Sequence, residues 1–148
     1  MDYILFSFLA VVSAVGTWFL AAHLVASLGW QRLAAAFQVD RLPRGPVCWL
    51  AYLGIDSMQY SGIGVVQATV VAEGLGLRVL FLFRVGHPPL VVPWSALGPL
   101  VATKSWWRTM YAVTIRVSEQ RSVRLRFRDQ RLAATMQPYL RLSSHRSG

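Results

Sequence analysis

The sequence predicts an α+β protein: a single N-terminal transmembrane helix, a small antiparallel β domain and a C-terminal helix. Three observations predict this fold class. Residues 3–29 contain no Asp, Glu, Lys or Arg. Later segments alternate apolar and polar residues with the period of two that a half-buried strand requires. Near the C-terminus the apolar residues are instead four positions apart, which places them on one face of a helix.

The uncharged N-terminal segment, YILFSFLAVVSAVGTWFLAAHLVASLG, is long enough to cross a bilayer. A helix of about 26 residues measures roughly 39 Å, and the hydrocarbon core is about 30 Å thick. A cleaved secretory signal would need a positively charged start and a shorter apolar core. Only Met1 and Asp2 precede this segment. We therefore expect a permanent transmembrane anchor over residues 1–30.

The charges that flank the anchor predict its orientation. No basic residue precedes it, whereas Arg32, Arg41 and Arg44 follow it closely. The positive-inside rule places the N-terminus outside and the rest of the chain in the cytoplasm. The single Cys48 cannot form an internal disulfide, as is usual in a reducing compartment. We expect a single-pass protein of the cell inner membrane.

The remainder divides into a juxtamembrane helix and linker (31–46), a β domain (47–142) and a disordered tail (143–148). Two prolines and a glycine end the short amphipathic helix after residue 40. The sequence then predicts six or seven strands, named at 48–53, 63–72, 77–83, 90–92, 111–117 and 123–127, with a turn at 73–76. A second membrane span over 63–83 is excluded, because Glu73 and Arg78 would each cost about 2.5–3.5 kcal/mol inside the bilayer.

The clearest β-hairpin lies near the end of the chain. Its two strands alternate apolar residues with polar ones, and a turn at 118–122 joins them. One face is apolar and the other carries arginines: Arg116, Arg124, Arg126 and Arg128. Asp129 is then a suitable N-cap for a helix that buries Leu132, Met136 and Leu140, and Pro138 is expected to end or distort that helix.

The order of elements, an antiparallel sheet followed by a C-terminal helix, resembles a pleckstrin-homology (PH) or GRAM-type domain. The segment LVVPWSAL at 90–97 is similar to a strand end found in bacterial domains of this type. The pattern GL-x-L … FR-x-GHPPL-x-x-PWS also resembles a family of small bacterial membrane-anchored proteins, over residues 29–100. The resemblance implies the architecture and no activity.

Signatures of catalysis are missing from the sequence. His87 and His145 are far apart, and no acidic residue is spaced to complete a metal site with either. Cys48 has no evident base partner, and no glycine-rich segment has the pattern of a phosphate-binding loop. We therefore predict a non-enzymatic protein without a cofactor or metal and without an apparent small-molecule substrate.

Two groups of residues are expected to serve the structure or the packing of the anchor. The GHPP turn could present His87 to a ligand or a proton, but we favour a structural role for the turn residues His87, Pro88, Pro89, Pro93 and Trp94. Transmembrane packing is assigned to Ser13, Thr17, Ala21 and His23. The small residues could pack against a partner helix, or they could reflect the ordinary composition of membrane helices. His23 could contact lipid headgroups, or it could have a specific functional role.

The C-terminal third is strongly basic. Ten of the 15 basic residues lie between Lys104 and Arg146 with only two acidic residues, a net charge of +8, against +1 for residues 1–103. A merely solvated face usually mixes signs. Anionic headgroups attract nearby basic residues by about 1 kcal/mol each. We expect the surface that contacts the membrane or a partner to consist of Arg116, Arg124, Arg126, Arg128, Trp106, Trp107 and Arg108.

These observations favour a protein whose cytoplasmic basic domain docks on anionic membrane lipids or on a membrane-associated partner. The alternative is an accessory subunit of a larger membrane protein complex, assembled through the transmembrane helix and a sheet edge. Nucleic acid is the weaker candidate partner. Although Trp106, Trp107 and Arg108 could stack on bases, a membrane tether is an unusual platform for that.

Overall fold

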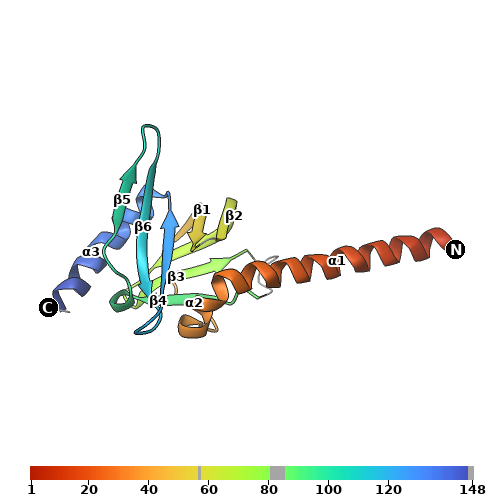
Figure 1. The fold of residues 1–148 in the computed structure, drawn as a ribbon, viewed down its shortest axis with the longest axis horizontal. Helices are drawn as coiled ribbons and strands as arrows, with labels where there is room; N and C mark the ends of the chain where they lie inside the picture. Colours follow the sequence, from red (N-terminus) through yellow and green to blue (C-terminus); the bar gives the residue numbers. More distant parts are fainter. Residues whose placement is uncertain (57, 81–85, 147–148) are drawn as a thin grey trace.

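The protein is described by a computed structural model over residues 1–56, 58–80 and 86–146, without the side chains of 22–23, 25–28, 58, 61–65 and 143–146. It is an α+β fold (Figure 1). The elements are α1 (Asp2–Leu28), α2 (Trp30–Phe37), β1 (Val47–Ile55), β2 (Met58–Val70), β3 (Gly74–Val79), β4 (Leu90–Pro93), the 3₁₀ turn η2 (Trp94–Ala96), β5 (Val101–Lys104), β6 (Thr109–Arg116), β7 (Ser122–Phe127) and α3 (Gln130–Arg146).

Helix α1 projects away from the rest of the molecule (Figure 1). Residues Asp2–Ala21 have a mean hydropathy of 2.2, and none of that window is buried by the protein. Large apolar side chains are exposed along it, including Phe6 at 71 % and Leu20 at 62 %. In the described part of the chain it is the one helix long and apolar enough to cross a membrane. The expected N-terminal helix is therefore present, and it is long and apolar enough to span a membrane.

In the described part of the chain, seven antiparallel strands form one sheet in the order β4-β3-β2-β1-β7-β6-β5. Each half is a meander, β1 to β4 and β5 to β7, and β1 joins the two. Strand β1 pairs with β2 along most of its length but with β7 only through Leu53–Ile55. From Leu53 back toward Val47, β1 is not paired with β7, so the two halves of the sheet separate there. This leaves an apolar interior for helices to cover.

The core lies between the sheet and the helices α2 and α3. Its largest fully buried side chains include Trp30 of α2 and Phe127 of β7. As expected, α3 buries Leu132, Met136 and Leu140. Asp129 caps this helix, because its Oδ1 accepts hydrogen bonds from the backbone N–H groups of residues 131 and 132 at 2.8 and 3.2 Å.

The C-terminal helix is longer than the sequence indicates. Pro138 lies inside α3 and does not end it, and the helix continues to Arg146 through residues expected to be disordered. A proline removes one hydrogen bond of the helix. Burial of Met136 and Leu140 on either side of Pro138 holds the helix against the core. Residues 147–148 of the expected tail lie outside the described part of the chain.

Strand boundaries differ from expectation at three places. Strand β5 was not expected, and β2 begins at Met58, five residues before the expected start. Strand β3 begins at Gly74, inside the expected turn at 73–76. Glycine is required there, because a Cβ on Gly74 would lie 2.1 Å from the carbonyl oxygen of Val92 in the neighbouring β4. The expected strand at 77–83 agrees with β3 as far as Val79, and its residues 81–83 lie outside the described part.

Replacement of Gly74 by alanine should destabilise the domain strongly. The new methyl group would meet the backbone of β4, so the β3–β4 pairing must separate or shift, at a cost of about 2 kcal/mol or more. Thermal unfolding of the detergent-solubilised chain measures the effect. Gly16→Ala is the matched control, since nothing lies within 4 Å of a Cβ at that position. Equal melting temperatures for the two variants would contradict the packing described here.

Candidate functional site

The anchor joins the domain through a buried bend. Gly29 separates α1 from α2 and is itself buried. A Cβ at this position would lie 3.0 Å from Cγ2 of Ile55, so the chain passes very close to the end of β1. The base of the transmembrane helix is thereby set against the turn between β1 and β2.

Helix α2 is fastened to the GHPP turn by hydrogen bonds. The indole N–H of Trp30 donates to the carbonyl oxygen of Pro88 at 2.8 Å. The side-chain amide of Gln31 donates to the carbonyl oxygen of Gly86 at 2.7 Å. Just after the helix, the backbone N–H of Val39 donates to the oxygen of Pro89 at 3.0 Å. The GHPP turn is therefore bonded to α2 and to the residues just after it.

His87, a residue of this turn, lies inside an aromatic cluster. Its ring is 3 % exposed and packs edge-on against Trp30 and Tyr60, with centroids 5.5 and 5.7 Å apart. Its Nε2 lies 3.1 Å from the hydroxyl of Tyr60. Burial raises the pKa of Tyr60 to about 12. These surroundings suit a packed side chain better than one that faces a ligand.

Pro93 and Trp94 follow at the end of β4. Pro93 is the last residue of that strand, which lies at one edge of the sheet. The Trp94 indole donates to the carbonyl oxygen of Val71 at 2.9 Å, and its ring stacks on Tyr139 of α3 with centroids 4.8 Å apart. Trp94 therefore joins the β2–β3 turn to the C-terminal helix.

Asp56 connects the base of the anchor to the basic hairpin. It adopts a left-handed backbone conformation with φ of 51°. One carboxylate oxygen lies 3.3 Å from Nη1 of Arg32, and the other accepts the backbone N–H of Arg124 at 3.0 Å. Its carbonyl oxygen accepts a bond from Nη2 of Arg126 at 2.7 Å. We call Asp56 with these three arginines the Asp56 hub.

The structure places the four predicted strand arginines on one face, which we call the arginine face. Cross-strand pairs set Arg124 opposite Thr114, and Arg126 opposite both Ala112 and Gly54. Arg126 lies over Gly54, and its buried Nε has no hydrogen-bond partner in the described structure. The guanidinium of Arg128 stacks on Tyr52 at 4.3 Å. The side chains of Arg116 and Arg124 are exposed.

The other predicted contact residues lie elsewhere. Trp106, Trp107 and Arg108 occupy the tip of the β5–β6 hairpin, which stands out from the domain (Figure 1). Trp106 is 94 % exposed and Trp107 is 65 % exposed. Seven residues of β6 lie between this tip and Arg116, a separation of about 27 Å along the strand. The arginine face runs along β6 and β7 from Arg116 to Arg128, which follows the Phe127 paired with Tyr111, whereas the two tryptophans lie on the protruding tip.

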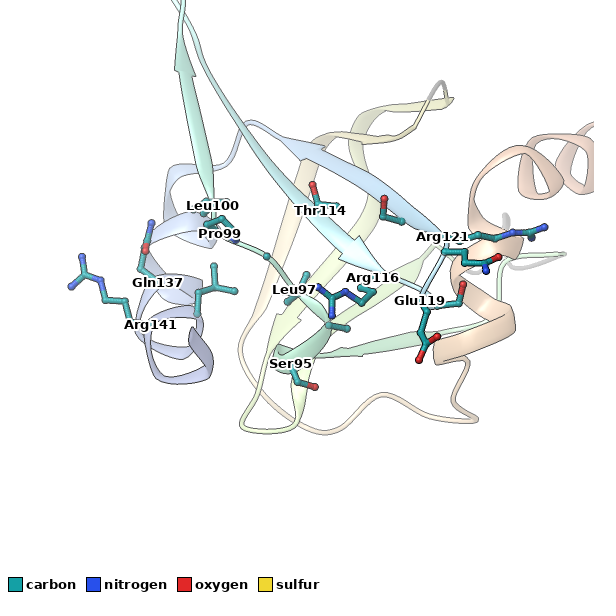
Figure 2. Close-up of a pocket in the computed structure, with 16 residues that line it drawn as sticks. Ser95, Leu97, Pro99, Leu100, Thr114, Arg116, Glu119, Arg121, Gln137 and Arg141 are labelled. Atoms are coloured by element: carbon teal, nitrogen blue, oxygen red, sulfur yellow. The ribbon is translucent and has the colours of Figure 1, made fainter. Parts of the chain in front are cut away.

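A groove of about 940 Å³ lies beside the arginine face. Figure 2 shows Arg116 in its middle, Gln137 and Arg141 of α3 at one end, and Glu119 with Arg121 at the other. Apolar side chains, including Leu97 and Leu100, form part of its lining. A groove of this kind can hold an extended anionic segment better than a compact ligand.

Comparison of the chain with protein-family models, with curated proteins and with solved structures gives no match. Function must therefore be argued from the residues and their geometry.

The anchor residues are only partly described. Thr17 Oγ1 donates to the carbonyl oxygen of Ser13 at 2.8 Å, a bond within the helix. Ser13, Thr17 and Ala21 are exposed to whatever surrounds α1. The side chain of His23, assigned above to transmembrane packing, lies outside the described structure.

The described residues contain neither a group of three metal-ligating side chains nor an activated cysteine. Among them, no three His, Cys, Asp or Glu side chains lie together so that they could hold a metal ion. Burial raises the pKa of the Cys48 thiol, the charge of Asp129 raises it further and that of Arg131 lowers it. An activated nucleophilic cysteine needs the opposite shift.

Sequence reasoning did not find Arg32, Asp56, Arg121 or Arg141. The bonds of Asp56 join residues that are 24 to 70 positions apart, and no local pattern encodes such contacts. One signal was present, because Asp56 is the only acidic residue between Asp40 and Glu73. An isolated acid beside an apolar strand suggests a structural partner.

Loss of the Asp56 side chain should loosen the hub. Asp56→Ala removes two interactions and strains a left-handed position, so we expect the free energy of unfolding to fall by about 2 kcal/mol. Asp56→Asn keeps an acceptor for the Arg124 N–H and tolerates that conformation, so its loss should be smaller. Urea unfolding of the full chain, followed by tryptophan fluorescence, measures both. Equal losses would argue against the hub.

The Cys48 thiol should react slowly with iodoacetamide. Because its pKa is raised, the midpoint of the rate–pH profile should lie above that of free cysteine. Asp129→Asn should move the midpoint down, since it removes a negative charge and keeps a capping oxygen. Arg131→Gln should move it up. A midpoint below that of free cysteine would refute the assigned surroundings.

Proposed function

We propose that the chain is a non-enzymatic single-pass protein of the inner membrane whose cytoplasmic, PH/GRAM-like domain docks on anionic lipid headgroups. The transmembrane helix supplies the location, and the arginine face supplies the orientation. The N-terminus faces outward in this proposal. The seven antiparallel strands followed by a helix support the PH/GRAM-like assignment.

One observation carries the lipid-docking proposal: the Asp56 hub lies at the base of α1. Gly29, the last residue before α2, contacts Ile55, and Asp56 then binds the side chains of Arg32 and Arg126 and the backbone N–H of Arg124. Two guanidinium groups and one carboxylate therefore gather where the chain leaves the apolar helix. Headgroups are the first groups that such a cluster meets.

Because α1 tethers the domain to the membrane, weak electrostatic contacts are sufficient for docking. Each arginine near an anionic surface contributes about 1 kcal/mol, which alone gives marginal binding. A tethered domain remains within reach of the surface, so its effective concentration there is high. The exposed side chains of Arg116 and Arg124 are available for these contacts, whereas Arg126 is partly occupied by Asp56.

The structure also favours a second candidate function, an accessory subunit of a membrane protein complex. Strand β5 forms one edge of the sheet, and all four of its residues are exposed. Exposed edges are common sites of protein association. A stable stoichiometric partner after extraction in mild detergent would support this candidate.

Energy transfer to the membrane tests lipid docking. Ser122 is exposed and lies opposite Arg116 on β6, so a donor dye on Ser122→Cys, in a Cys48→Ser background, reports on the arginine face. In nanodiscs with headgroup acceptors, transfer should be greater with phosphatidylglycerol present than with phosphatidylcholine alone. High salt should abolish the difference, because exposed charges are screened.

Two triple variants make the comparison specific. Arg116→Gln, Arg124→Gln and Arg128→Gln together should abolish the response to phosphatidylglycerol. Arg41→Gln, Arg44→Gln and Arg131→Gln remove the same charge from exposed positions that are not part of the arginine face and should leave the response intact. Equal loss in both triple variants, or no response of the unmodified face to lipid charge, would exclude the proposed docking.

A further inference from the structure

We propose that the outer edge of β5 and the two tryptophans at the tip of the β5–β6 hairpin bind an extended, acidic segment of a partner protein as an added β-strand. This inference rests on the second candidate function, assembly with a partner, and is independent of lipid docking. It names the edge used and the chemistry of the segment that binds there.

The register of the hairpin shows which backbone groups are available. The backbone N–H of Ser105 donates to the carbonyl oxygen of Arg108 at 2.8 Å, so these two form a hydrogen-bonded pair. Hydrogen-bonded pairs alternate along an antiparallel ladder, and Thr103 opposite Met110 is the next. Ala102 and Lys104 therefore direct their N–H and C=O groups outward, where a further strand can bond them.

The two edges of the sheet are not equivalent. At the other edge, the first residue of β4 is already paired, because Gln38, just after α2, forms a bridge with Leu90. Strand β5 has an exposed outer side and carries only Lys104 as a protective charge. It is therefore the edge to which a strand can be added.

The hairpin tip supplies the side-chain anchors. Among the described residues outside α1, Trp106 and Trp107 are the most exposed aromatic side chains, and buried tryptophans dominate binding energies at protein interfaces. The guanidinium of Arg108 lies 4.4 Å from the Trp107 ring centroid, which holds that ring in place. A partner that covers both rings buries apolar surface that otherwise faces water.

Charge selects an acidic partner. The sequence has no Asp or Glu between Glu73 and Glu119, and Lys104 and Arg108 flank the tryptophans. Like charges opposite one another destabilise cross-strand pairs, whereas opposite charges stabilise them. A segment that carries Asp or Glu beside β-branched residues complements this edge.

The groove extends the same surface. Its lining includes Pro99 and Leu100, the two residues that precede β5, together with Arg116 and Arg141. Figure 2 shows Pro99 and Leu100 between Arg141 on one side and Arg116 on the other. An acidic segment that runs past Val101 along the sheet edge therefore enters a groove lined by arginines.

A bilayer fits the hairpin tip less well than a protein does. The Asp56 hub lies at the base of α1, and the tip lies beyond the other end of β6. Figure 1 shows the hairpin standing crosswise to α1, with its tip at a distance from that helix. A partner protein beside the domain can therefore reach the tip.

Peptide selection tests the proposal on the full chain. In phosphatidylcholine nanodiscs, a displayed library of random linear peptides should yield sequences rich in Asp or Glu and in β-branched residues. Fluorescence anisotropy of a selected peptide then measures affinity for each variant. Trp106→Ala with Trp107→Ala, and Lys104→Glu with Arg108→Glu, should each weaken binding at least about tenfold.

A matched pair of variants isolates the backbone contribution. Ala102→Pro removes an outward N–H without removing a bond to β6, because proline is tolerated at this kind of edge position. It should also weaken peptide binding at least about tenfold. Ala102→Ser keeps the N–H and should bind as the unmodified chain does. Thermal unfolding of each variant shows whether it is folded. If Ala102→Pro is not folded, the Lys104→Glu with Arg108→Glu variant tests the proposal in its place.

Four outcomes would overturn the inference. Selection could yield no peptide that depends on the hairpin, or Ala102→Pro could bind as tightly as Ala102→Ser. Quenching by brominated lipids could also fall when Trp106 and Trp107 are replaced by phenylalanine, which would place the tip in the bilayer. A partner that co-purifies equally with Ala102→Pro would support the accessory-subunit function and exclude this edge as its site.

Discussion

Burial of Trp30 is the interaction on which the arrangement of this protein depends. No described side chain of α1 belongs to the core, and the eight-residue α2, which does contribute to it, positions the domain relative to α1. A helix this short is not stable by itself in water, and packing must hold it. The fully buried Trp30 ring, with its indole N–H on Pro88, provides that packing. The Asp56 hub forms beside the anchor only because α2 is fixed in this way.

The basic character of the chain serves two purposes that the sequence does not separate. Arg126 and Arg128 make contacts within the protein, with the Asp56 carbonyl and the Tyr52 ring, and these contacts stabilise the outer face of β1 and β7. Arg116 and Arg124 remain open to a partner surface. Net charge therefore overstates how much of the arginine face is available for binding. The exposed members of the set carry the long-range attraction.

Periodicity explains which parts of the fold could be predicted. The apolar helix, the β6–β7 hairpin and the capped α3 each bury one face, and burial imposes a repeat on the sequence. Strand β5 buries nothing, so its four residues show no alternation and were missed. Asp56 was missed because its partners are brought close only by the finished sheet. The extent of α3 depends on core contacts on both sides of Pro138, which local propensity does not include.

The position of β1 in the sheet also bears on how the chain is made. Its pairing with β2 can form as soon as both have left the ribosome, whereas its pairing with β7 must wait for residues 125–127. Until then, the side of β1 that β7 will cover is an unpaired edge, open to other nascent chains. That edge is covered only when β7, the last strand to be made, pairs with Leu53–Ile55. The sheet is therefore incomplete until almost the whole β domain has been synthesised.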